Sequence, residues 1–423
     1  MNNSKHIKDI ANVTNGKSDV KNAVEGGHFP FFDRSVIIKK SNRFLFDGEA
    51  IIIPGEDSRE IFEPRYYKGK FDLHQRCYAI YNFNSEIYPK YLFYKLKTLT
   101  RHFRNVFVGS TVPSLRLEHI TDLKIDLPIF GKQKTSADFL FSLDSKIELN
   151  NKISAELEAM AKTIYDYWFV QFDFPNAKGK PYKTSGGKMV WSEELKRDIP
   201  EGWEVKDLAN LTEIISRGIS PKYLDKGGIC VLNQKCIREN KVLFEFSRRH
   251  DNESKSAISR KVKLYDILVN STGVGTLGRV AIVKRLPEEL ITVDSHVTIV
   301  RANSKEINPF YFGFTLIQKQ KEIEGFSVGS TGQVELSRSQ LERINLIVPS
   351  TDIQSSFADM YKSTLNRIAI LESENQQLAS LRDWLLPMLM NGQVRVKDAE
   401  KMLEQKLDMA AEASGTYKKS KVK

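Results

Sequence analysis

The sequence has few of the residues from which catalytic and metal sites are usually built. Of its 423 residues only three are cysteines (Cys77, Cys230 and Cys236) and seven are histidines. The cysteines have no zinc-finger spacing and give no disulfide framework, which favours a reducing compartment. The sequence contains no His-x-x-x-His pair and no Walker-type glycine–lysine loop. We therefore expect a non-catalytic protein without a metal site.

Long apolar runs are also missing. No stretch approaches the roughly 20 apolar residues that a membrane helix needs. The basic residues Lys5, His6 and Lys8 precede no apolar core of a signal peptide. These absences predict a cytoplasmic protein.

Positive charge, in contrast, is abundant. The chain has 64 Lys plus Arg against 53 Asp plus Glu, a formal net charge of +11, and its pI is about 9.2. Such a surplus favours a polyanionic partner such as double-stranded DNA, because Lys and Arg that neutralise phosphates release condensed counterions. The alternative is a basic soluble protein without such a partner. The length allows two or three domains, each with its own core.

One segment of the chain occurs twice. Residues 87–111 match residues 307–331 without a gap. The identical pairs are Ile87/Ile307, Pro89/Pro309, Tyr91/Tyr311, Leu96/Leu316, Val108/Val328 and the Gly-Ser-Thr triplets at 109–111 and 329–331. Residues 7–14 also recur at 205–212, with only aliphatic exchanges. Fixed-order similarity indicates one structural unit built twice, and it suggests a ligand that is itself in two parts.

Each copy is expected to be a mixed globular part followed by a long helix. The predicted fold class is α/β (mixed α+β), with two similar globular domains, two long antiparallel coiled-coil-like helices and an internal pseudo-two-fold repeat. The expected boundaries are 1–134 for the first globular domain, 135–170 for the first helix, 171–203 for a connector, 204–352 for the second globular domain, 353–392 for the second helix and 393–423 for a charged tail. The copies differ chiefly in loops ahead of the matching window, and recognition is usually located in such loops. The connector is rich in Gly, Pro and Lys, yet its aromatic residues, Trp191 among them, are expected to be buried.

The two helices carry apolar residues at heptad spacing, which indicates helix pairing. We expect these seams to be exposed and to bind partner subunits. The predicted partner-binding residues are Leu143, Ile147, Leu157, Ile164, Trp168, Ile368, Leu371, Leu378, Leu385 and Leu389. Both seams turn polar near the middle, at Asn150 and Ser154 and at Asn375. The alternative is two surface helices, each packed on its own domain.

Two segments suggest chemistry that their surroundings exclude. Residues 273–278 match G-x-G-x-x-G, but a dinucleotide site needs a helix next, and residues 279–284 form an expected strand. Asn308-Pro-Phe-Tyr311 is similar to the loop with which adenine methyltransferases hold a flipped base. Its repeat counterpart is Tyr88-Pro-Lys-Tyr91, so the shared feature is a proline at a helix start. A glycine-rich loop between strands, able to approach DNA closely, fits residues 273–278 better.

Candidate DNA-binding residues are polar or glycine residues at the ends of expected strands. The repeat aligns His74-Gln75-Arg76 with Asp294-Ser295-His296, and such side chains read base edges or bind phosphates. Structural roles such as strand capping remain open for each. The full set is Gly55, Lys68, Lys70, His74, Gln75, Arg76, Ser110, Thr111, Asn233, Lys235, Asn270, Ser271, Thr272, Gly273, Gly275, Arg279, Ser295, His296, Ser330, Thr331, Gln333 and Arg338.

Residues 168–208, from WFVQFDFP to WEVKDL, and residues 378–394, LASLRDWLLPMLMNGQV, carry a resemblance that spans residues 5 to about 393. Together with the repeated architecture they resemble the specificity subunit of type I restriction–modification enzymes. The resemblance implies a non-catalytic subunit whose two target-recognition domains each read one half of a split, asymmetric DNA site. It implies that the helices act as spacer and as dock for two modification (methyltransferase) subunits, which bind S-adenosylmethionine, while a restriction (translocase/nuclease) subunit uses ATP and Mg. No cofactor is expected in this chain.

Two other classes of protein remain as alternatives. A stand-alone DNA-binding regulator would need neither the long helices nor the connector. A single-chain modification enzyme would need a methyl-donor loop, and the sequence has none.

Overall fold

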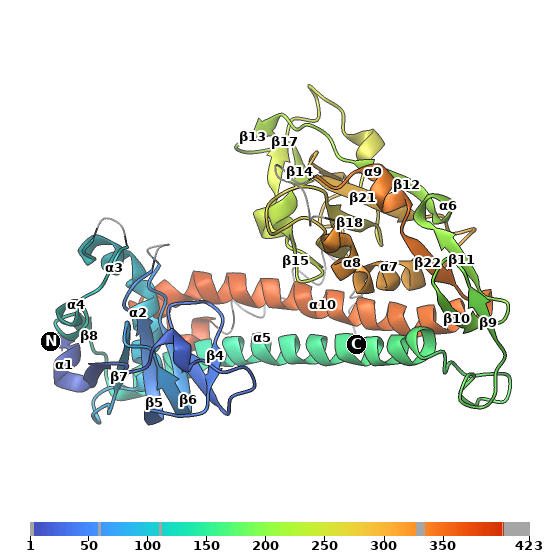
Figure 1. Ribbon diagram of the computed structural model, residues 1–423. Coiled ribbons are helices and arrows are strands. Elements are labelled where there is room, and N and C mark those ends of the chain that lie inside the picture. Colours follow the sequence, from blue (N-terminus) through green and yellow to red (C-terminus); the bar gives the residue numbers. More distant parts are fainter. Residues whose placement is uncertain (1–3, 58–60, 110–111, 327–334, 400, 402–423) are drawn as a thin grey trace, which may run out of the picture. The chain divides into compact units, whose positions relative to one another are not determined.

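The computed structural model describes residues 4–57, 61–109, 112–326, 335–399 and 401. The chain forms two compact units: Met1–Leu149 with Glu374–Lys423, and Asn150–Ser373. We call them unit 1 and unit 2. Each unit contains one globular part, and the chain passes from one unit to the other inside two long helices (Figure 1). The predicted mixed fold with two repeated domains and long helices is confirmed.

The globular part of unit 1 is built on a six-stranded sheet of order β2-β7-β5-β6-β3-β4. Its strands are β2 (Asn12–Asn15), β3 (Phe29–Phe32), β4 (Lys39–Ser41), β5 (Phe46–Pro54), β6 (Arg65–Leu73) and β7 (Cys77–Tyr81). The remaining elements are β1 (Ser4–His6) paired with β8 (Lys124–Asp126), and the helices α1 (Ile7–Ile10), α2 (Pro89–Thr98), α3 (Thr100–Val106) and α4 (Leu117–Thr121).

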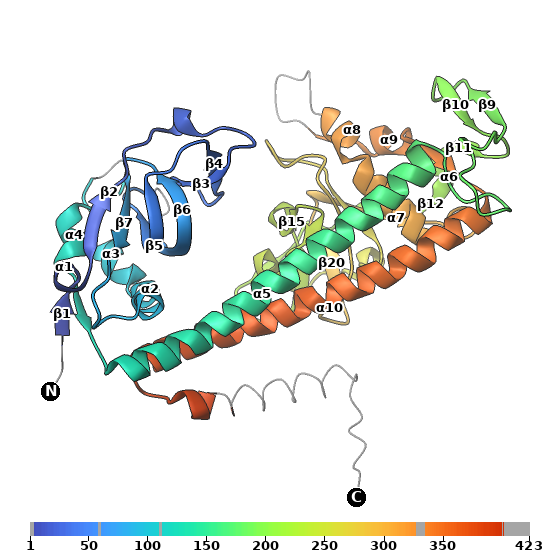
Figure 2. The ribbon, with the colours of Figure 1, turned by 90° about the horizontal axis from the view of Figure 1, so that it is seen from below.

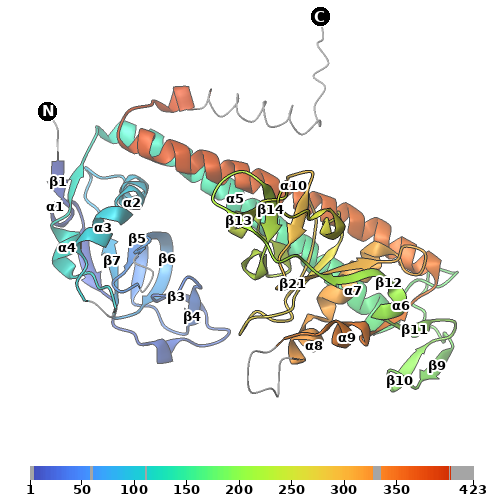
Figure 3. The same cartoon turned by 90° about the horizontal axis from the view of Figure 1, so that it is seen from above.

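Strand β5 shows why the sheet is buried on both faces. Ile51 and Ile53 join the cluster that contains α2, whereas Ala50 and Ile52 join a second cluster on the opposite face. Successive side chains of a strand point to opposite faces, so a continuous aliphatic run stabilises both clusters. α2 covers the first face (Figure 3).

The globular part of unit 2 has two four-stranded sheets, of orders β12-β21-β18-β19 and β13-β17-β14-β20. Their strands are β12 (Thr212–Arg217), β13 (Tyr223–Leu224), β14 (Ile229–Leu232), β17 (Arg248–His250), β18 (Ile267–Asn270), β19 (Val280–Ile282), β20 (Ile291–Val293) and β21 (Val297–Ala302). Smaller pairs are β9 (Met189–Ser192) with β10 (Arg197–Pro200), β11 (Glu204–Asp207) with β22 (Asn345–Val348), and β15 (Ile237–Arg238) with β16 (Lys241–Val242). The helices are α6 (Leu208–Leu211), α7 (Pro309–Gln318), α8 (Gln320–Gly325) and α9 (Arg338–Glu342).

The second copy divides one strand of the first copy into two. In unit 1, the first part of β6, from Arg65 to Phe71, pairs with β5, and its last two residues, Asp72 and Leu73, pair with β3. In unit 2 these two pairings belong to separate strands, β19 and β20. The segment 283–290 between them contains Pro287, and proline cannot donate a ladder hydrogen bond. One sheet therefore becomes two.

The matching window of the repeat forms the same structure twice. Pro89 and Pro309 begin α2 and α7. The hydroxyl of Tyr91 donates to Asp126 O at 3.3 Å, and that of Tyr311 donates to Ile347 O at 2.8 Å. These two tyrosines are kept because each ties its helix to the strand that precedes a long helix.

Two buried glutamines perform a second shared task. Gln133 Nε2 donates to Pro128 O at 2.9 Å, and its Oε1 accepts from Tyr88 N–H. Gln354 makes the same two bonds, to Pro349 O at 2.7 Å and from Asn308 N–H. A buried amide must satisfy donor and acceptor groups, so each glutamine fixes the start of a long helix on its own domain.

The long helices are α5 (Phe130–Tyr165), of 36 residues, and α10 (Thr351–Met390), of 40 residues. α5 begins earlier than the predicted 135 and continues as a π-helical turn over Asp166–Val170. Within unit 1 the two helices are joined by an Arg382–Asp144 ion pair of 2.6 Å. Within unit 2, Lys284 of the globular part pairs with Glu158 of α5 and Glu372 of α10. Figure 2 shows the two helices side by side.

The predicted exposure of the helix seams is wrong. Within this chain, six of the ten predicted partner-binding residues are buried and four are half-buried. The buried ones are Leu143, Ile368, Leu371, Leu378, Leu385 and Leu389, and the half-buried ones are Ile147, Leu157, Ile164 and Trp168. Each unit covers its own stretch of the seams with its second helix and its globular core. Helix pairing and packing of each helix on its own globular part were predicted as alternatives, but both occur.

The connector is folded within unit 2. Phe172, Phe174 and Trp203 are buried and lie in ring contact, with the Phe174 and Trp203 rings stacked at 4.8 Å. Trp191 is 57% exposed, contrary to the prediction that it is buried. It lies on β9, which forms a two-stranded sheet with β10, and its Nε1 donates to the exposed Glu193 at 2.9 Å rather than to a buried acceptor.

The described helices include none that is long and apolar enough to cross a membrane. The three cysteines are buried thiols. Burial raises the pKa of Cys77 and of Cys236 to about 12, so neither is a reactive thiolate at neutral pH.

Candidate nucleic-acid interface

Each unit places the two aligned triplets in the same position, a turn between adjoining strands. His74-Gln75-Arg76 connects β6 to β7, and residues 294–296 connect β20 to β21. His74 N–H donates to Phe32 O, and Asp294 N–H donates to Leu232 O. The end of β3 and the end of β14 therefore meet equivalent turns, and the same edge of the fold is formed twice.

A glycine brings a third segment to each turn. An added Cβ on Gly16 would lie 2.1 Å from Leu73 O, and one on Gly218 would lie 1.9 Å from Val293 O. Gly16 N–H donates to Cys77 O and Gly218 N–H donates to Val297 O, both at 3.1 Å. These contacts leave no room for a side chain, so glycine is required at both positions.

In unit 1 the edge carries two arginines on one carboxylate. Arg76 Nη1 lies 2.9 and 2.8 Å from the two oxygens of Glu56, and Arg34 Nη1 lies 2.5 Å from one of them. Glu56 is mostly buried, whereas the Arg76 side chain is 54% exposed. Two guanidinium groups on one carboxylate leave a net positive charge at the surface. Exposed guanidinium groups bind phosphate or guanine edges well.

His74 has a structural role. Its side chain is 3% exposed, and burial, assisted by Arg34, lowers the pKa of the imidazole. The neutral ring accepts the Arg76 N–H at its Nδ1 (3.1 Å). His74 therefore shapes the turn that presents Gln75 and Arg76.

A hollow of about 580 Å³ opens beside this turn. Its lining residues are Val20, Asp33, Arg34, Ser35, Val36, Lys39, Glu56, Asp57 and Val112. The hollow is therefore bounded by the Arg34–Glu56 ion pair and by other residues of the loop that follows β3.

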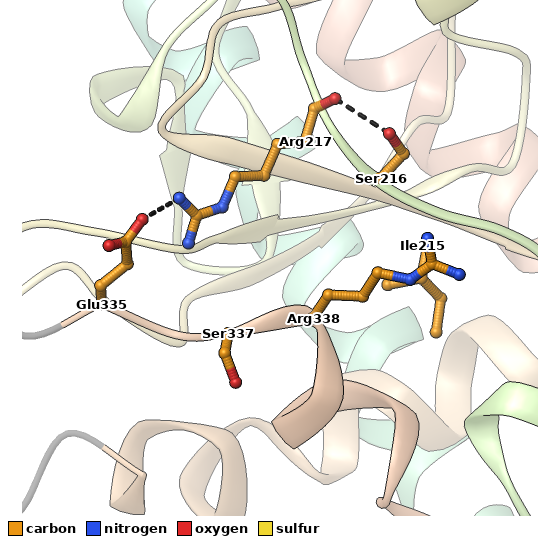
Figure 4. A pocket seen from close by; sticks show the side chains of 6 residues that line it. All are labelled: Ile215, Ser216, Arg217, Glu335, Ser337 and Arg338. Carbon is orange, nitrogen blue, oxygen red and sulfur yellow. Dashed lines mark hydrogen bonds and ion pairs between the residues drawn. The ribbon is translucent and has the colours of Figure 1, made fainter.

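Unit 2 has an arginine–glutamate pair at the equivalent edge (Figure 4). Arg217, at the end of β12, forms an ion pair with Glu335 and donates to Leu336 O at 2.8 Å. Glu335 bridges to Thr272, as Ser114 bridges to Glu56 in unit 1. The glutamate is thus the first partner along the chain in the unit 1 bridge (Glu56) and the second partner in the unit 2 bridge (Glu335). Together with Arg217 and Glu335, Ser337 and Arg338 line a second hollow, of about 460 Å³, in unit 2.

The glycine-rich loop of unit 2 connects two strands, as predicted. β19 follows it, so a dinucleotide-binding helix is absent at this position of the described chain. Gly273 and Gly275 have φ of +104° and +73°. A Cβ on Gly273 would lie 2.3 Å from Gln234 Oε1, so the loop packs tightly. Its outer surface includes Thr272, whose hydroxyl lies 2.7 Å from His296 Nδ1.

The second motif that suggested chemistry also has a structural role. Asn308 accepts the Phe310 N–H at 3.0 Å and caps α7. Pro309 stands in the first turn of the helix, where a missing N–H costs nothing.

The predicted DNA-binding residues fall into four groups. Exposed and able to meet a ligand are Lys68, Lys70, Gln75, Arg76, Lys235, Gly275, His296 and Arg338; partly exposed are Thr272, Gly273, Arg279 and Ser295. Buried, and therefore unable to read a base with a side chain in this structure, are Gly55, His74, Asn233, Asn270 and Ser271. Ser110, Thr111, Ser330, Thr331 and Gln333 lie outside the described residues.

The buried candidates instead hold the loops in place. Asn270 Nδ2 donates to Gln234 O at 3.1 Å, and Ser271 Oγ lies 2.5 Å from Thr298 Oγ1. Asn233 caps the short turn Gln234–Cys236 by accepting Lys235 N–H at 2.8 Å. Lys68 and Lys70 lie along β6 rather than on the 74–76 turn.

Asn270→Ala should therefore lower stability more than it changes the DNA sequence that is recognised. Removing the amide leaves Gln234 O without its buried donor, which costs about 1–3 kcal/mol. Thermal unfolding of the purified chain measures the loss, with Asn105→Ala, at an exposed position of α3 in unit 1, as a comparison. If Asn270→Ala unfolded like the parent protein but accepted new DNA sequences, the predicted base-reading role would be right after all.

Sequence reasoning missed Arg34 and Arg217. Both become visible only when the edge is assembled from segments far apart in the chain.

Comparisons with known proteins identify the family of the chain and agree with its internal repeat. A family model described as the type I restriction modification DNA specificity domain matches residues 2–159 and 200–380. The chain belongs to this specificity-domain family. Each matched range holds one globular part and part of a long helix, so the internal repeat is the family domain present twice.

Full-length relatives of the family support the same assignment. The chain is 26% identical over 431 residues to the type I restriction enzyme MjaIX specificity subunit of Methanocaldococcus jannaschii, covering 93% of this chain and 94% of the relative. It is 23% identical to the HindI specificity subunit of Haemophilus influenzae, over 73% of this chain and 78% of the relative. The resemblance to specificity subunits, with the non-catalytic role it implies, is confirmed.

A solved structure shares the fold. The S subunit of a type I restriction-modification system from M. genitalium superposes with a TM-score of 0.56 at 16% identity, covering 91% of this chain and 95% of that one. At this identity the match speaks for the fold alone.

Proposed function

We propose that each globular part reads one half of a bipartite, asymmetric duplex DNA site. The observation that carries the proposal is the edge that is formed twice. The same backbone frame presents Gln75 and Arg76 in unit 1, and Ser295 and His296 in unit 2. An identical frame with different exposed side chains can recognise two different half-sites.

Membership of the family supports a proposal for the partners. The chain docks two modification subunits that bind S-adenosylmethionine and methylate adenine. A restriction subunit that uses ATP and Mg joins the same complex. Because the helix seams are buried within the chain, the docking surface lies on the exposed faces of α5 and α10, which include Leu149, Met160 and Ile370.

Domain exchange tests the proposal. The chain is purified with its modification subunits, and methylated sites are mapped before and after residues 1–134 are replaced by those of a relative. One half of the site should change and the other half should stay. Methyl transfer by the chain alone, or a change in both halves, would contradict the proposal. Binding to a one-part site without any modification subunit would favour the stand-alone regulator.

Two exposed residues of unit 1 should have different roles in DNA binding. Gln75 lies on the turn and should read a base, so Gln75→Ala should reduce discrimination at one position by about 1–3 kcal/mol. Lys70 lies on β6 and should contact a phosphate. Lys70→Ala should therefore weaken binding to all DNA sequences alike, and the slope of log K against log salt concentration should fall by about one. Binding titrations at several salt concentrations, on cognate and substituted duplexes, separate the two outcomes. Equal effects of Gln75→Ala on every duplex would exclude base reading by Gln75.

A further inference from the structure

Three consecutive aliphatic side chains of unit 1 lie in solvent beside the Arg34–Glu56–Arg76 cluster. Val36 is 65% exposed, Ile37 77% and Ile38 51%. They belong to the loop between β3 and β4, residues 33–38. Contiguous exposed apolar surface of this kind usually marks a binding site.

The loop has a fixed shape. The carboxylate of Asp33, itself 6% exposed, accepts the Ser35 N–H at 2.8 Å and lies 2.6 Å from both Ser35 Oγ and Lys39 Nζ. Burial alone would raise the pKa of Asp33, but the bonds from Lys39 and Ser35 lower it, so the carboxylate stays ionised. Arg65 also donates to Ser35 O. These bonds hold the aliphatic tip outward, and Val and Ile have few rotamers of their own.

The same position in unit 2 begins in the same way and then diverges. Asn233 follows β14 as Asp33 follows β3, and it accepts the Lys235 N–H at 2.8 Å, as Asp33 accepts that of Ser35. The strand that pairs antiparallel with β3 begins at Lys39 in unit 1, whereas the strand that pairs antiparallel with β14 begins only at Arg248 in unit 2. A shared start with a different length is what a recognition loop on a common frame requires.

The residues around the tip favour DNA as its ligand, because DNA is a polyanion that presents apolar groups in its major groove. Arg34 and Lys40 are exposed on either side of the tip, and Gln75 and Arg76 lie on the adjoining turn. In the major groove of DNA the apolar feature of a base edge is the C5-methyl group of thymine, and phosphates flank it. The cations around the tip (Arg34, Lys39, Lys40 and Arg76) outnumber the carboxylates that lie among them (Asp33, Glu56 and Asp57), so the charge around the aliphatic centre complements a polyanion.

We propose that the tip Val36-Ile37-Ile38 enters the major groove and contacts a thymine methyl group in the half-site of unit 1, with Arg34 and Lys40 on the flanking phosphates. This inference rests on the proposed function. It assigns part of the half-site specificity to apolar contact by this loop, in addition to hydrogen bonding by the 74–76 turn.

The test uses the complex with modification subunits and the half-site that methylation mapping assigns to unit 1. Each thymine of that half-site is replaced in turn by uracil, which lacks the methyl group. The parent complex should lose about fourfold in affinity at one position. Ile37→Ser should bind the thymine duplex about tenfold more weakly and should no longer distinguish thymine from uracil.

A matched control removes equal apolar surface elsewhere in unit 1. Ile129 is 72% exposed, and Ile129→Ser should keep both the affinity and the uracil effect. Ile37→Val, which keeps a branched aliphatic group, should retain most of the uracil effect. Because Ile37 is exposed, the unfolding temperature of Ile37→Ser should match that of the parent protein.

Three results would overturn the inference. The uracil effect could persist in Ile37→Ser, or no thymine could show the effect in the parent complex. The Ile37→Ser variant could also fail to bind the modification subunits and still bind DNA as the parent protein does, which would make the loop a protein-docking site. Failure of the proposed function is distinct, since the parent complex would then methylate no two-part site at all.

Discussion

Gly218→Ala should remove recognition of the half-site of unit 2 and leave that of unit 1 in place. The added Cβ would lie 1.9 Å from Val293 O and 2.5 Å from Asp294 O, much closer than van der Waals contact allows. The strand cannot yield without loss, because Ile219 N–H donates to Val293 O at 3.0 Å. Overpacking of this kind costs on the order of 1–3 kcal/mol or more, and the cost falls on the turn that presents Ser295 and His296.

The expected result has two readouts. Chemical denaturation of the purified chain should show a less stable unit 2, and methylation mapping of the complex should show a site specified at the first half alone. Gly325→Ala is the matched control in the same unit, because a Cβ there meets nothing within 4 Å. An unchanged site with Gly218→Ala would show that the turn takes no part in recognition. Gly16→Ala, with a Cβ 2.1 Å from Leu73 O, should affect the other half.

The helices and the repeat were predictable from sequence because their signals are local. Heptad spacing marks α5 and α10, and the proline at position 89 or 309 marks a helix start. Tyr91 and Tyr311 were visible as identities, although their shared bond to the strand before each long helix needed the structure.

The burial of polar candidates was not predictable in the same way. Asn270 ends a buried strand, and sequence cannot show that the turn at Gln234 closes over it. His74 and Arg76 are separated by one residue, yet one is buried and the other is exposed. Their exposure depends on Gly16 and Arg34, which arrive from distant parts of the chain.

The heptad seams illustrate a different limit. An apolar stripe predicts that a helix has a partner, but it does not say whether the partner belongs to the same chain. Here Leu385 and Leu389 pack into the core of unit 1, and Leu365 and Ile368 are buried in unit 2.

Lengthening both long helices should lengthen the spacer between the half-sites. The chain crosses between the units at Leu149–Asn150 inside α5 and at Ser373–Glu374 inside α10. Four residues inserted at both crossings add about 6 Å of rise and about 40° of rotation. At about 3.4 Å per base pair, the preferred spacer should grow by one or two base pairs while both half-site sequences stay the same.

The insertion must be made in both helices, because each unit pairs a stretch of α5 with a stretch of α10. In unit 1 the pairing includes Asp144 with Arg382 and Lys146 with Glu374. A four-residue insertion in a heptad pattern unwinds a coiled coil locally without ending it, so matched insertions preserve these contacts and a single insertion would not. As a control, four residues added after Gly179, at an exposed turn of the connector, lengthen the chain but not the helices. Selection of methylated sites from duplexes with randomised spacers decides the matter. A spacer that lengthened with the connector insertion, or stayed constant with the helix insertions, would show that the helices do not set the distance between half-sites.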